Sequence, residues 1–349
     1  MGSEMCIRDR SMRWTPLDTL MLRGSYGTGF KAPSMRNIAQ PLAFYGSTSG
    51  SYSCPFPGSP GCLPGSAQYD LLLGGNPSAG SDGLEAENSK QWTVGFRVEP
   101  SKELSLGLDM WNVSLTKQIM DNGVPEQWAF NHAAQYASLF INPYFDQGGN
   151  VNTIAYKEVP VNGGTANYQG LDWDISSRLI TPLGPLATAF AGTYMLKQHY
   201  TLIGDTNEYS DLGRYGLDQQ VVFRVQMHLA STLITGKFSN TVQANYKSGY
   251  HDQPYSSGDA TVFQLNPDGT TGAAVDFAPR QVASYTTFDW QGNYNYSKAL
   301  TFTAGVKNLF DRSPPLTIQS GGGGDQLGYD GRYADALGRS IYVTGHYHF

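Results

Sequence analysis

Residues 288–307 read FDWQGNYNYSKALTFTAGVK, and their pattern of apolar and polar residues indicates the fold class. Phe288, Trp290 and Tyr294 alternate with polar residues. After the dipeptide at 297–298, the even-numbered residues from 300 to 306 are apolar and alternate with the residues between them. Strict alternation of this kind places successive side chains on opposite faces of a β-strand. The stretch therefore predicts two antiparallel strands joined by a short turn, each with one apolar and one polar face.

The same alternation recurs along the whole chain. It predicts about ten strands, at residues 20–30, 92–98, 104–110, 171–178, 186–196, 221–230, 238–246, 282–296, 300–307 and 341–349. Many exceed the ~5–6 residues typical of soluble sheets and reach the ~9–11 residues that cross a bilayer. A soluble sandwich tends to shorter strands, whereas a transmembrane barrel puts the apolar face in lipid and pairs every backbone group around the ring. The strand lengths favour an all-β fold, a transmembrane antiparallel β-barrel.

Composition narrows the class of protein further. Aromatic residues make up 13% of the 349 residues, which argues against a disordered chain. No stretch approaches the ~18 consecutive apolar residues of a membrane-spanning helix, but barrel strands average to an ordinary hydropathy and escape this test. A net charge of −6 lacks the basic footprint of a nucleic-acid binder, so we expect no nucleic-acid partner.

The connections between the predicted strands alternate between short and long. Short ones lie at residues 100–102, 181–185, 235–236 and 297–298, and long ones at 31–88, 118–164, 201–216, 251–280 and 311–338. Outer-membrane barrels have short periplasmic turns and longer extracellular loops. The alternation therefore predicts that the long connections face outward and that the chain ends on the periplasmic side.

The first ten residues, MGSEMCIRDR, match nothing downstream, and we interpret residues 1–10 as a non-native leader. This interpretation also discounts Cys6. The start has no apolar core of the ~7–15 residues that a signal peptide needs. With a leader of this kind, the missing signal peptide says nothing about the compartment. We expect residues 11–349 to be the C-terminal portion of a barrel.

The two remaining cysteines, Cys54 and Cys62, bracket the turn-forming segment CPFPGSPGC. A disulfide across this loop would contribute about 2–3 kcal/mol by the chain-entropy relation and imply an oxidising compartment. The alternatives are two unpaired thiols or a fortuitous metal pair. The CxxC spacing of metal sites is absent, so we predict the disulfide.

Five segments, in this order, resemble stretches of TonB-dependent outer-membrane receptors. They are LRGSYGTGFKAPS at 22–34, LEAENSKQWTVGFRVEP at 84–100, NGGTANYQGLDWDI at 162–175, AGVKNLFDRSPP at 304–315 and YADALGRSIYVTGHYHF at 333–349. The fourth, which resembles the family's G-V-x-N-L-F-(D/N) box, is the most specific. Ala86 stands where the family usually has Pro. The resemblance covers nearly all of the chain from Trp14 onward.

This resemblance implies an active importer of an external ligand, such as a siderophore or another nutrient, in the outer membrane of a Gram-negative bacterium. Family members have a barrel of about 22 strands filled by a plug domain, and TonB with the inner-membrane energising complex drives them. No plug sequence is present here, so the chain would be about the last ten strands. The terminal aromatics Tyr347 and Phe349 resemble the signal that the barrel-assembly machinery reads.

Two sets of residues are candidates for function in such a barrel. Charged residues in the lumen phase of the strands are candidate contacts for the missing plug, or else a hydrated wall: Arg97, Glu99, Asp172, Asp174, Arg178, Arg224, Lys307 and Arg339. Aromatic residues of the outer loops are candidate ligand contacts, although loop aromatics often pack their own loop: Phe44, Tyr45, Tyr52, Trp128 and Tyr255.

Two alternatives treat the chain as a complete small barrel. A passive porin would have no plug sequence upstream. A barrel hydrolase would need a catalytic histidine at the outer rim, where His199 and His251 lie beside Asp205 and Asp252. Nothing resembles a nucleophile motif, so we expect no enzyme activity, and the sequence indicates no cofactor. The inward pair His346 and His348 is more consistent with lumen side chains than with a metal site.

Overall fold

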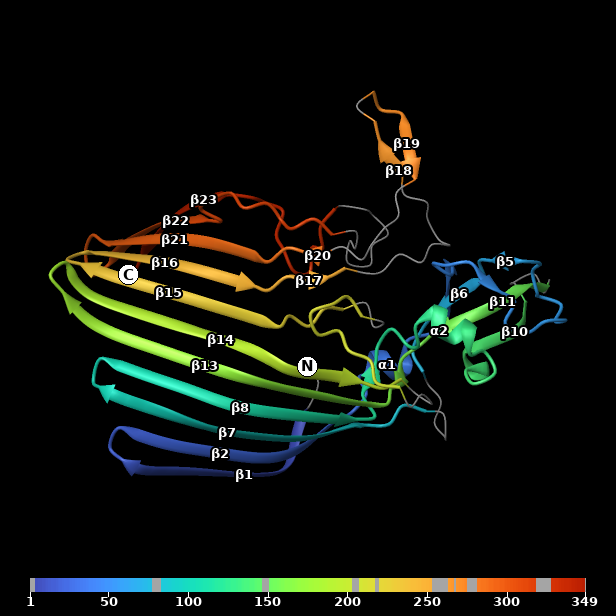
Figure 1. The fold of residues 1–349 in the computed structure, drawn as a ribbon, viewed down its shortest axis with the longest axis horizontal. Helices are drawn as coiled ribbons and strands as arrows, with labels where there is room; N and C mark the ends of the chain where they lie inside the picture. Colours follow the sequence, from blue (N-terminus) through green and yellow to red (C-terminus); the bar gives the residue numbers. More distant parts are fainter. Residues whose placement is uncertain are drawn as a thin grey trace.

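The computed structural model is a wide curved sheet with folded loops gathered at one end (Figure 1). It describes residues 4–76, 83–145, 151–202, 207–216, 220–252, 263–266, 268–274, 281–317 and 328–348. No helix in these ranges is long and apolar enough to cross a membrane.

Eleven antiparallel strands form the sheet, and their order in space is their order in the chain. They are β1 (Glu4–Leu17), β2 (Leu20–Lys31), β7 (Glu87–Ser101), β8 (Leu104–Thr116), β13 (Thr165–Thr181), β14 (Gly184–Tyr200), β15 (Val225–Thr235), β16 (Phe238–Lys247), β21 (Tyr285–Asn295), β22 (Leu300–Lys307) and β23 (Ser340–Tyr347). The strands β1 and β23 are the two edges of the sheet, and no strand of the described chain pairs with either outer edge.

The predicted all-β architecture is confirmed, with one strand more than the expected ten. The additional strand is β1, whose first half consists of residues 4–10. These residues pair with the outer half of β2, for example Arg10 with Tyr26. Backbone pairing requires no particular side chain, so the interpretation of residues 1–10 as a non-native leader stays a prediction.

One predicted strand begins later than its alternation indicates. Residues 221–224 continue the pattern of β15, but β15 starts at Val225. Val221 and Phe223 are 7% and 6% exposed and pack in a cluster of outer loops. Alternation alone does not distinguish a face that meets lipid from one that packs inside a folded loop. The same is true of Val282, which precedes β21 and is fully buried.

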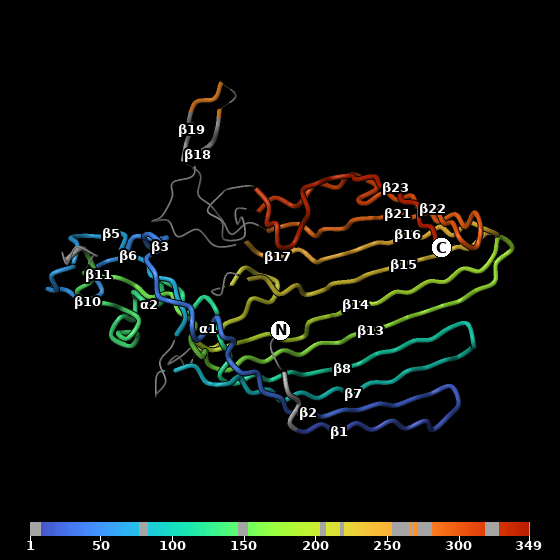
Figure 2. The backbone as a smooth tube through the Cα atoms, turned by 180° about the vertical axis from the view of Figure 1, so that it is seen from behind, coloured from blue at the N-terminus to red at the C-terminus, as the bar shows by residue number. Residues whose placement is uncertain are grey.

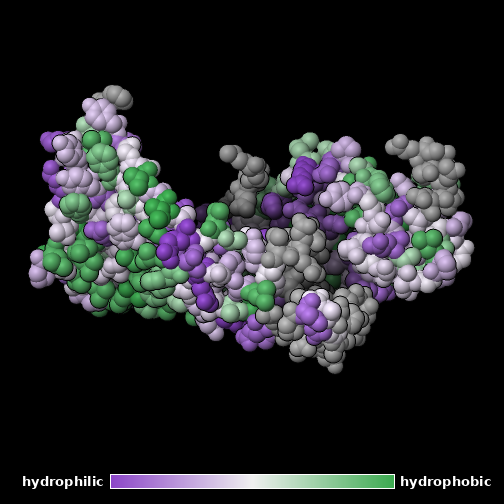
Figure 3. Space-filling view, turned by 90° about the horizontal axis from the view of Figure 1, so that it is seen from above, coloured by the Kyte–Doolittle hydropathy of each residue, from purple (hydrophilic) through white to green (hydrophobic). Residues whose placement is uncertain are grey.

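The register gives the sheet one apolar and one polar face. A row across five strands shows the first: Leu22, Phe96, Leu108, Trp173 and Gly192 are successive partners. Directly paired residues share a face, and large apolar side chains on this one are exposed, such as Val94 at 60%. Figure 3 shows apolar side chains gathered over the end of the molecule away from the loops. We call the two sides the apolar face and the polar face.

The connections alternate as predicted (Figure 2). Turns of two to four residues lie at 18–19, 102–103, 182–183, 236–237 and 296–299, and the long connections are 32–86, 117–164, 201–224, 248–284 and 308–339. In the turn at 236–237, Gly236 has φ 59°, a left-handed conformation that glycine adopts without steric cost. All the long connections emerge at the same end of the sheet.

The first two long connections fold together into what we call the loop module. Its four-stranded sheet has the order β10 (Phe140–Phe145), β11 (Val151–Glu158), β6 (Asp70–Leu73) and β3 (Ala43–Ser47). Short elements complete it: α1 (Met35–Ala39), α2 (Glu126–Asn131), the 3₁₀ turn η1 (Ala137–Leu139) and the paired strands β4 (Tyr52–Ser53) with β5 (Ser66–Ala67) and β9 (Ile119–Met120) with β12 (Val161–Asn162).

The remaining long connections contain two further strand pairs. These are β17 (Tyr250–His251) with β20 (Gln281–Val282), and β18 (Phe263–Leu265) with β19 (Thr271–Ala274). The first pair belongs to a second buried loop cluster, formed by Tyr215, Val221, Phe223, Tyr250 and Val282 with Tyr333 packed against it. The described parts of these later connections therefore also contain folded structure.

Candidate functional site

Four charged side chains form a network on the polar face of the sheet. Arg23 Nε on β2 donates a hydrogen bond to Asp109 Oδ1 on β8 at 2.7 Å, and its Nη2 lies 3.8 Å from Asp174 Oδ1 on β13. Arg97 on β7 forms a second ion pair with Asp174. Charge-assisted bonds of this kind are stronger than neutral ones, and here they cross-link four strands.

A glycine lies under two of these three ion pairs. In the register, Gly95 stands between Arg23 and Asp109, and Gly107 stands between Arg97 and Asp174. A Cβ atom at either glycine would overlap the carboxylate that crosses it. Glycine is therefore required for each arginine to reach a partner two strands away.

The same arrangement recurs without charge near the other edge of the sheet. Tyr342 on β23 reaches across Gly305 on β22, and its hydroxyl donates a hydrogen bond to Gln291 Oε1 on β21 at 2.9 Å. A Cβ at Gly305 would overlap the tyrosine ring. Long polar side chains that cross the intervening strand at a glycine are thus a repeated feature of this sheet.

The predicted plug-facing charges fall into separate groups in the structure. Arg97 and Asp174 belong to the network, and Asp172 accepts a hydrogen bond from Thr193 Oγ1 at 2.7 Å. Arg224 lies just before β15 and donates to the Met195 carbonyl at 3.3 Å. The remaining predicted charges are exposed near strand ends or in the last long connection: Glu99, Arg178, Lys307 and Arg339.

Sequence reasoning missed two members of the network, Arg23 and Asp109. Both lie in the polar phase of predicted strands, so a complete inventory of charged residues in that phase would have included them. Their contact was not predictable from spacing, because they are separated by 86 positions and meet only through the register of three strands.

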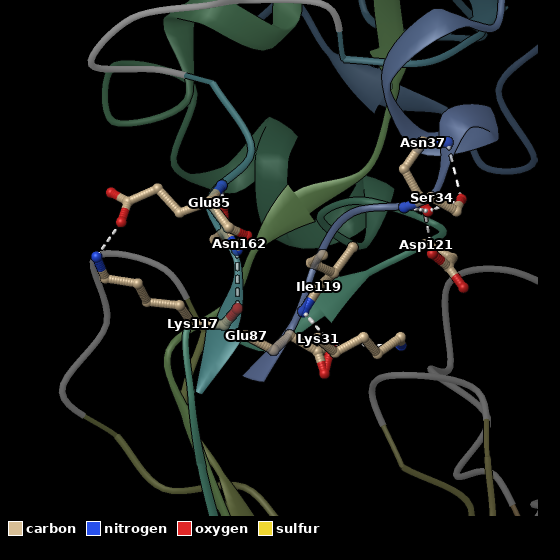
Figure 4. A network of polar contacts seen from close by, with 9 residues as sticks. All are labelled: Lys31, Ser34, Asn37, Glu85, Glu87, Lys117, Ile119, Asp121 and Asn162. Carbon is tan, nitrogen blue, oxygen red and sulfur yellow. Dashed lines mark hydrogen bonds and ion pairs between the residues drawn. The ribbon is translucent and has the colours of Figure 1, made fainter. Parts of the chain in front are cut away.

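A second polar network ties the outer ends of the strands together (Figure 4). The Glu87 side chain, at the start of β7, lies 3.5 Å from Lys31 Nζ at the end of β2. The same carboxylate accepts a hydrogen bond from the backbone N–H of Ile119 at 3.1 Å, in the second long connection. Glu87 is only 8% exposed, so this bond satisfies a group that has little access to water.

Asn162 extends this network to the start of β13. Its Nδ2 donates to the carbonyls of Glu85 and Lys117 at 2.9 and 2.8 Å, and its Oδ1 accepts from the Glu85 N–H at 2.6 Å. Lys117 and Glu85 also form an exposed ion pair. We call the five residues Lys31, Glu85, Glu87, Lys117 and Asn162 the junction, because they connect the strand ends to the loop module.

The loop module adds a further contact above the junction. Ser34 caps the short helix α1 by accepting the Asn37 N–H at 3.2 Å, and Asn37 Nδ2 donates to Asp121 Oδ1 at 2.6 Å. The first long connection is thereby fastened to the second where both leave the sheet (Figure 4).

Phe130 lies at the centre of the loop-module core. Its ring stacks on Tyr52 at 4.3 Å between centroids and meets Tyr69, Phe140 and Tyr156 at 5.1–5.8 Å. Burial raises the pKa of the Tyr156 hydroxyl well above its ordinary range. This hydroxyl donates to the Val124 carbonyl. The module thus has the aromatic interior of a small soluble domain.

The structure joins Cys54 and Cys62 by a disulfide, with Cα atoms 5.5 Å apart. Cys54 packs against the core of the loop module, together with Phe56. Phe56 in turn meets the edge of Phe140. The bridge therefore closes a loop that covers one side of the core.

The five predicted ligand contacts differ in exposure. Phe44 and Tyr45 on β3 are 60% and 72% exposed. Tyr52 is 8% exposed and belongs to the core, where its hydroxyl donates to Glu126 Oε2 at 3.0 Å. Trp128 is half-buried, and its Nε1 donates to the Tyr136 hydroxyl at 3.1 Å. Tyr255 lies outside the described residues.

The second loop cluster buries carboxylates beside its aromatic rings. Asp252 is 2% exposed and accepts the Thr317 hydroxyl at 2.8–2.9 Å. Arg332 Nη2 lies 2.6 Å from Asp330 Oδ2, a carboxylate that is buried. Burial raises the pKa of Tyr250 to about 12. An open hollow beside the cluster is lined by residues 329 and 331–337. Within the described ranges, no three metal-binding side chains gather at one place.

The comparison with protein families identifies the chain. The model described as "TonB dependent receptor-like, beta-barrel" matches residues 11–309. The chain belongs to this family of TonB-dependent receptor barrels. Its members are receptors and transporters of the outer membrane rather than enzymes. A search of curated proteins finds no match.

Solved structures of TonB-dependent receptors share the fold. The siderophore receptor PirA from Acinetobacter baumannii is 17% identical with a TM-score of 0.62, and the match covers 98% of this chain and 40% of that one. A mutant of the ferric enterobactin receptor PfeA from Pseudomonas aeruginosa is 17% identical with a TM-score of 0.57, covering 97% and 39%. The FrpB iron transporter from Neisseria meningitidis is 10% identical with a TM-score of 0.53, covering 97% and 38%. The chain therefore spans about 40% of the length of these receptors.

Three of the five segments that resemble the receptor family meet at the junction. Lys31 comes from GFKAPS, Glu85 and Glu87 from LEAENS, and Asn162 from NGGTANYQG. In this TonB-dependent receptor barrel, these segments hold the long connections to the strand ends. The resemblance points to these segments, but nothing in the sequence predicts that they contact one another.

The C-terminal aromatics of the receptor barrel are described in part. Tyr347 lies on β23, is 56% exposed and pairs with Leu300 on the apolar face. Phe349, the other residue of the predicted assembly signal, lies outside the described residues. The apolar phase of β23 includes Ile341 and Val343, which are 74% and 73% exposed.

Proposed function

We propose that this chain is the C-terminal half of the barrel of an outer-membrane receptor that imports an external ligand, such as a siderophore or another nutrient. The observation that carries this proposal is the family match over residues 11–309, a range that extends from β1 to β22 of the eleven-stranded sheet with one apolar face. The structural neighbours include siderophore receptors and an iron transporter. In such a receptor the apolar face meets lipid and the polar face lines the lumen.

The proposed partners follow from this placement. The rest of the barrel and a plug domain would lie outside this chain, and TonB with the inner-membrane energising complex would act on that other part. The outer-membrane lipid would cover the apolar face. The barrel-assembly machinery would read the end of β23 through Tyr347 and Phe349. The compartment that we propose is the outer membrane of a Gram-negative bacterium, where the disulfide of Cys54 and Cys62 is stable.

The ion pairs of the wall bear on which charged residues we propose as plug contacts. Arg97 and Asp174 already neutralise each other together with Arg23 and Asp109, so they offer a plug little net charge. Exposed charges are the stronger candidates, and these are Glu99, Arg178, Lys307 and Arg339.

The exposure of the loop aromatics likewise bears on which of them we propose as ligand contacts. Phe44 and Tyr45 expose their rings at the long-loop end, whereas Tyr52 is used in the core of the loop module. Exposed aromatic side chains provide a large contact area at low conformational cost. We therefore retain Phe44 and Tyr45 as candidates for contact with an external ligand.

We also retain the proposal that residues 1–10 are a non-native leader. The family match begins at Ser11, directly after this segment. The sequence of the DNA upstream of Ser11 in the source genome provides the test. A plug-domain sequence that continues directly into Ser11 supports both the leader and the receptor proposals. A signal peptide placed directly before Ser11 would contradict the receptor proposal.

Transport itself is tested by deletion of the full-length gene. The deletion strain should lose uptake of one nutrient from a panel of labelled ferric siderophores, vitamins and oligosaccharides, and removal of TonB should have the same effect. Uptake that persists without TonB but requires the gene would indicate a passive pore instead. The double variant of Phe44→Ala and Tyr45→Ala should weaken binding of that nutrient, with Phe302→Ala on the apolar face as the control.

A further inference from the structure

At the end of the sheet nearest the long loops, the apolar face is bordered by a group of polar side chains. On β7, β8, β13 and β14 the last row without a charged or amide side chain consists of Val94, Met110, Leu171 and Tyr194. The next row is Trp92, Asn112, Gln169 and Lys197, and the row after that is Lys90, Ser114, Asn167 and His199. These two rows therefore lie at the outer boundary of the apolar band.

The amide and hydroxyl groups in the middle of these rows hold one another in place. Asn167 Nδ2 donates to Ser114 Oγ at 2.7 Å, and Asn112 Nδ2 donates to Asn167 Oδ1 at 3.1 Å. Ser114 Oγ donates to Asn112 Oδ1 at 3.2 Å. The three side chains are only partly buried, so donors and acceptors that this cycle does not use face outward.

Lysines flank this polar group on both sides. Lys90 and Lys197 are exposed, and neither forms an ion pair with any described residue. On the apolar face of β7, β8, β13 and β14, Lys90 and Lys197 are the side chains that carry a permanent charge. No carboxylate of these four strands lies on that face. At the β14 end of the rows, Glu208 Oε1 lies 3.9 Å from His199 Nε2.

Two lysines at the edge of a lipid-facing wall create a site for an anionic group at that depth. A Lys near an anionic membrane surface gains attraction to phosphate without being withdrawn from water. The two lysines stand three strands apart, which corresponds to roughly 14 Å at the usual strand spacing. Trp92 adds an amphipathic ring of the type that lies at membrane interfaces.

We propose that Lys90, Lys197 and the Asn112–Ser114–Asn167 group bind the phosphorylated saccharide head group of an outer-leaflet glycolipid. The lysines pair with its phosphates, and the amides and hydroxyl contact its sugar hydroxyls. Its acyl chains then lie on the apolar row that follows. This inference rests on the proposed placement of the apolar face in the outer membrane. Arg8 and Arg10 continue the two rows on β1, beside Thr28 and Tyr26, but they belong to the first ten residues, and we define the site without them.

The test measures glycolipid bound to the full-length receptor in detergent micelles by native mass spectrometry, with rough-type lipopolysaccharide as the probe. The double variant of Lys90→Gln and Lys197→Gln should bind it about 10- to 30-fold more weakly. The matched control is Lys102→Gln with Lys298→Gln, which removes the same charge from exposed positions in the short turns at the opposite end of the strands. The control should bind like the wild type.

Two further arms identify the source of the anionic group. The dephosphorylated glycolipid should bind the wild type and the double variant equally weakly. Inorganic phosphate at millimolar concentration should not displace the glycolipid, because it lacks the saccharide and the acyl chains. The site is overturned if the double variant retains wild-type binding, if the turn variant loses as much, or if inorganic phosphate alone displaces the lipid.

The binding measurement is independent of transport. If the gene proves unnecessary for nutrient uptake while the double variant still loses the glycolipid, the importer proposal fails and the lipid site stands. If uptake requires the gene while the double variant binds glycolipid like the wild type, the lipid site fails alone. A thermal-unfolding measurement on each variant confirms that it is folded before binding is compared.

Discussion

The barrel wall and the loop module place their apolar side chains in opposite ways. In the wall, Ile341 and Val343 are 74% and 73% exposed, whereas in the module Tyr69, Ile154 and Tyr156 are fully buried. The wall relies on lipid to cover its apolar face, and backbone pairing with polar cross-links holds it together. The module is stabilised by its own interior, as a small soluble domain is. One chain thus contains two kinds of stability, which respond differently to the same type of substitution.

The largest contrast is expected for the removal of a phenyl ring. Phe130→Ala should destabilise the loop module by about 3–5 kcal/mol, because the ring fills the centre of a packed core and leaves a cavity. Limited proteolysis and hydrogen exchange of the full-length protein should show faster opening of residues 43–73, 119–145 and 151–158. Phe302→Ala on the wall, where the ring is 44% exposed, should leave the exchange of its strand unchanged. Equal effects at both sites would contradict the comparison.

A glycine substitution tests how the wall is cross-linked. Gly107→Ala should destabilise the barrel by about 1–3 kcal/mol, since the new methyl group overlaps the Asp174 carboxylate and displaces it from Arg97. The midpoint of denaturant unfolding in lipid vesicles measures this change. The matched variant is Gly24→Ala, where the nearest atom to an added Cβ is 3.7 Å away. If both variants shift the midpoint equally, the crossing ion pairs do not stabilise the wall.

The junction connects the wall to the loop module, and substitutions in it should destabilise mainly the loop module. Glu87→Ala should cost about 1–2 kcal/mol, because it leaves the N–H of Ile119 without its acceptor in a buried position. Hydrogen exchange at the Ile119 amide should accelerate. Glu85→Ala removes an exposed ion pair with Lys117 and should cost less than about 1 kcal/mol. A larger effect for Glu85 than for Glu87 would refute the assignment.

The smallest expected effect is a pH dependence of the second loop cluster. Burial raises the pKa of Tyr250 to about 12 from its ordinary value of 10. Below pH 10 the hydroxyl is neutral in both states, and its contribution to stability is fully present. Between pH 10 and about 12 the unfolded form ionises first, so the cluster loses stability as pH rises.

Tyr250→Phe should therefore reduce the fall in stability across that window, as measured by hydrogen exchange of residues 281–284 against pH. Part of the fall should remain, because burial also raises the pKa of Tyr215. Tyr45→Phe, at an exposed position, is the control and should leave the pH profile unchanged. A profile identical in the wild type and in Tyr250→Phe would show that another group governs it.

Most of the wall was predictable from the sequence, because a strand between lipid and lumen alternates along its whole length. Alternation does not predict the strand β1, because Arg8 and Arg10 occupy the phase that is apolar in neighbouring strands and residues 1–10 resemble a leader. Alternation wrongly predicts a strand over residues 221–224, because Val221 and Phe223 keep the alternation of β15 while packing inside a loop cluster. Periodicity reports the backbone conformation but not what covers the apolar side.

The contacts of the candidate site were less predictable than its segments. The junction brings together residues of three segments that are up to 131 positions apart, from Lys31 to Asn162, and only the sheet register makes them neighbours. The loop module was not expected at all, because its strands are short and its core aromatics read as loop residues. Tyr52 illustrates this: the same ring suits a ligand contact or a core, and its partner Phe130 decides between them.

The open edges of the sheet have a consequence for assembly. The strand β1 is 14 residues long and β23 is 8 residues long, and each has one unpaired edge. The backbone N–H and C=O groups along these edges form no hydrogen bonds with another strand of the described chain. Hydrocarbon provides no substitute partner, and each unsatisfied group costs several kcal/mol there. A bilayer therefore selects against this sheet until further strands close the ring. In water, the same two edges are templates along which separate copies would polymerise.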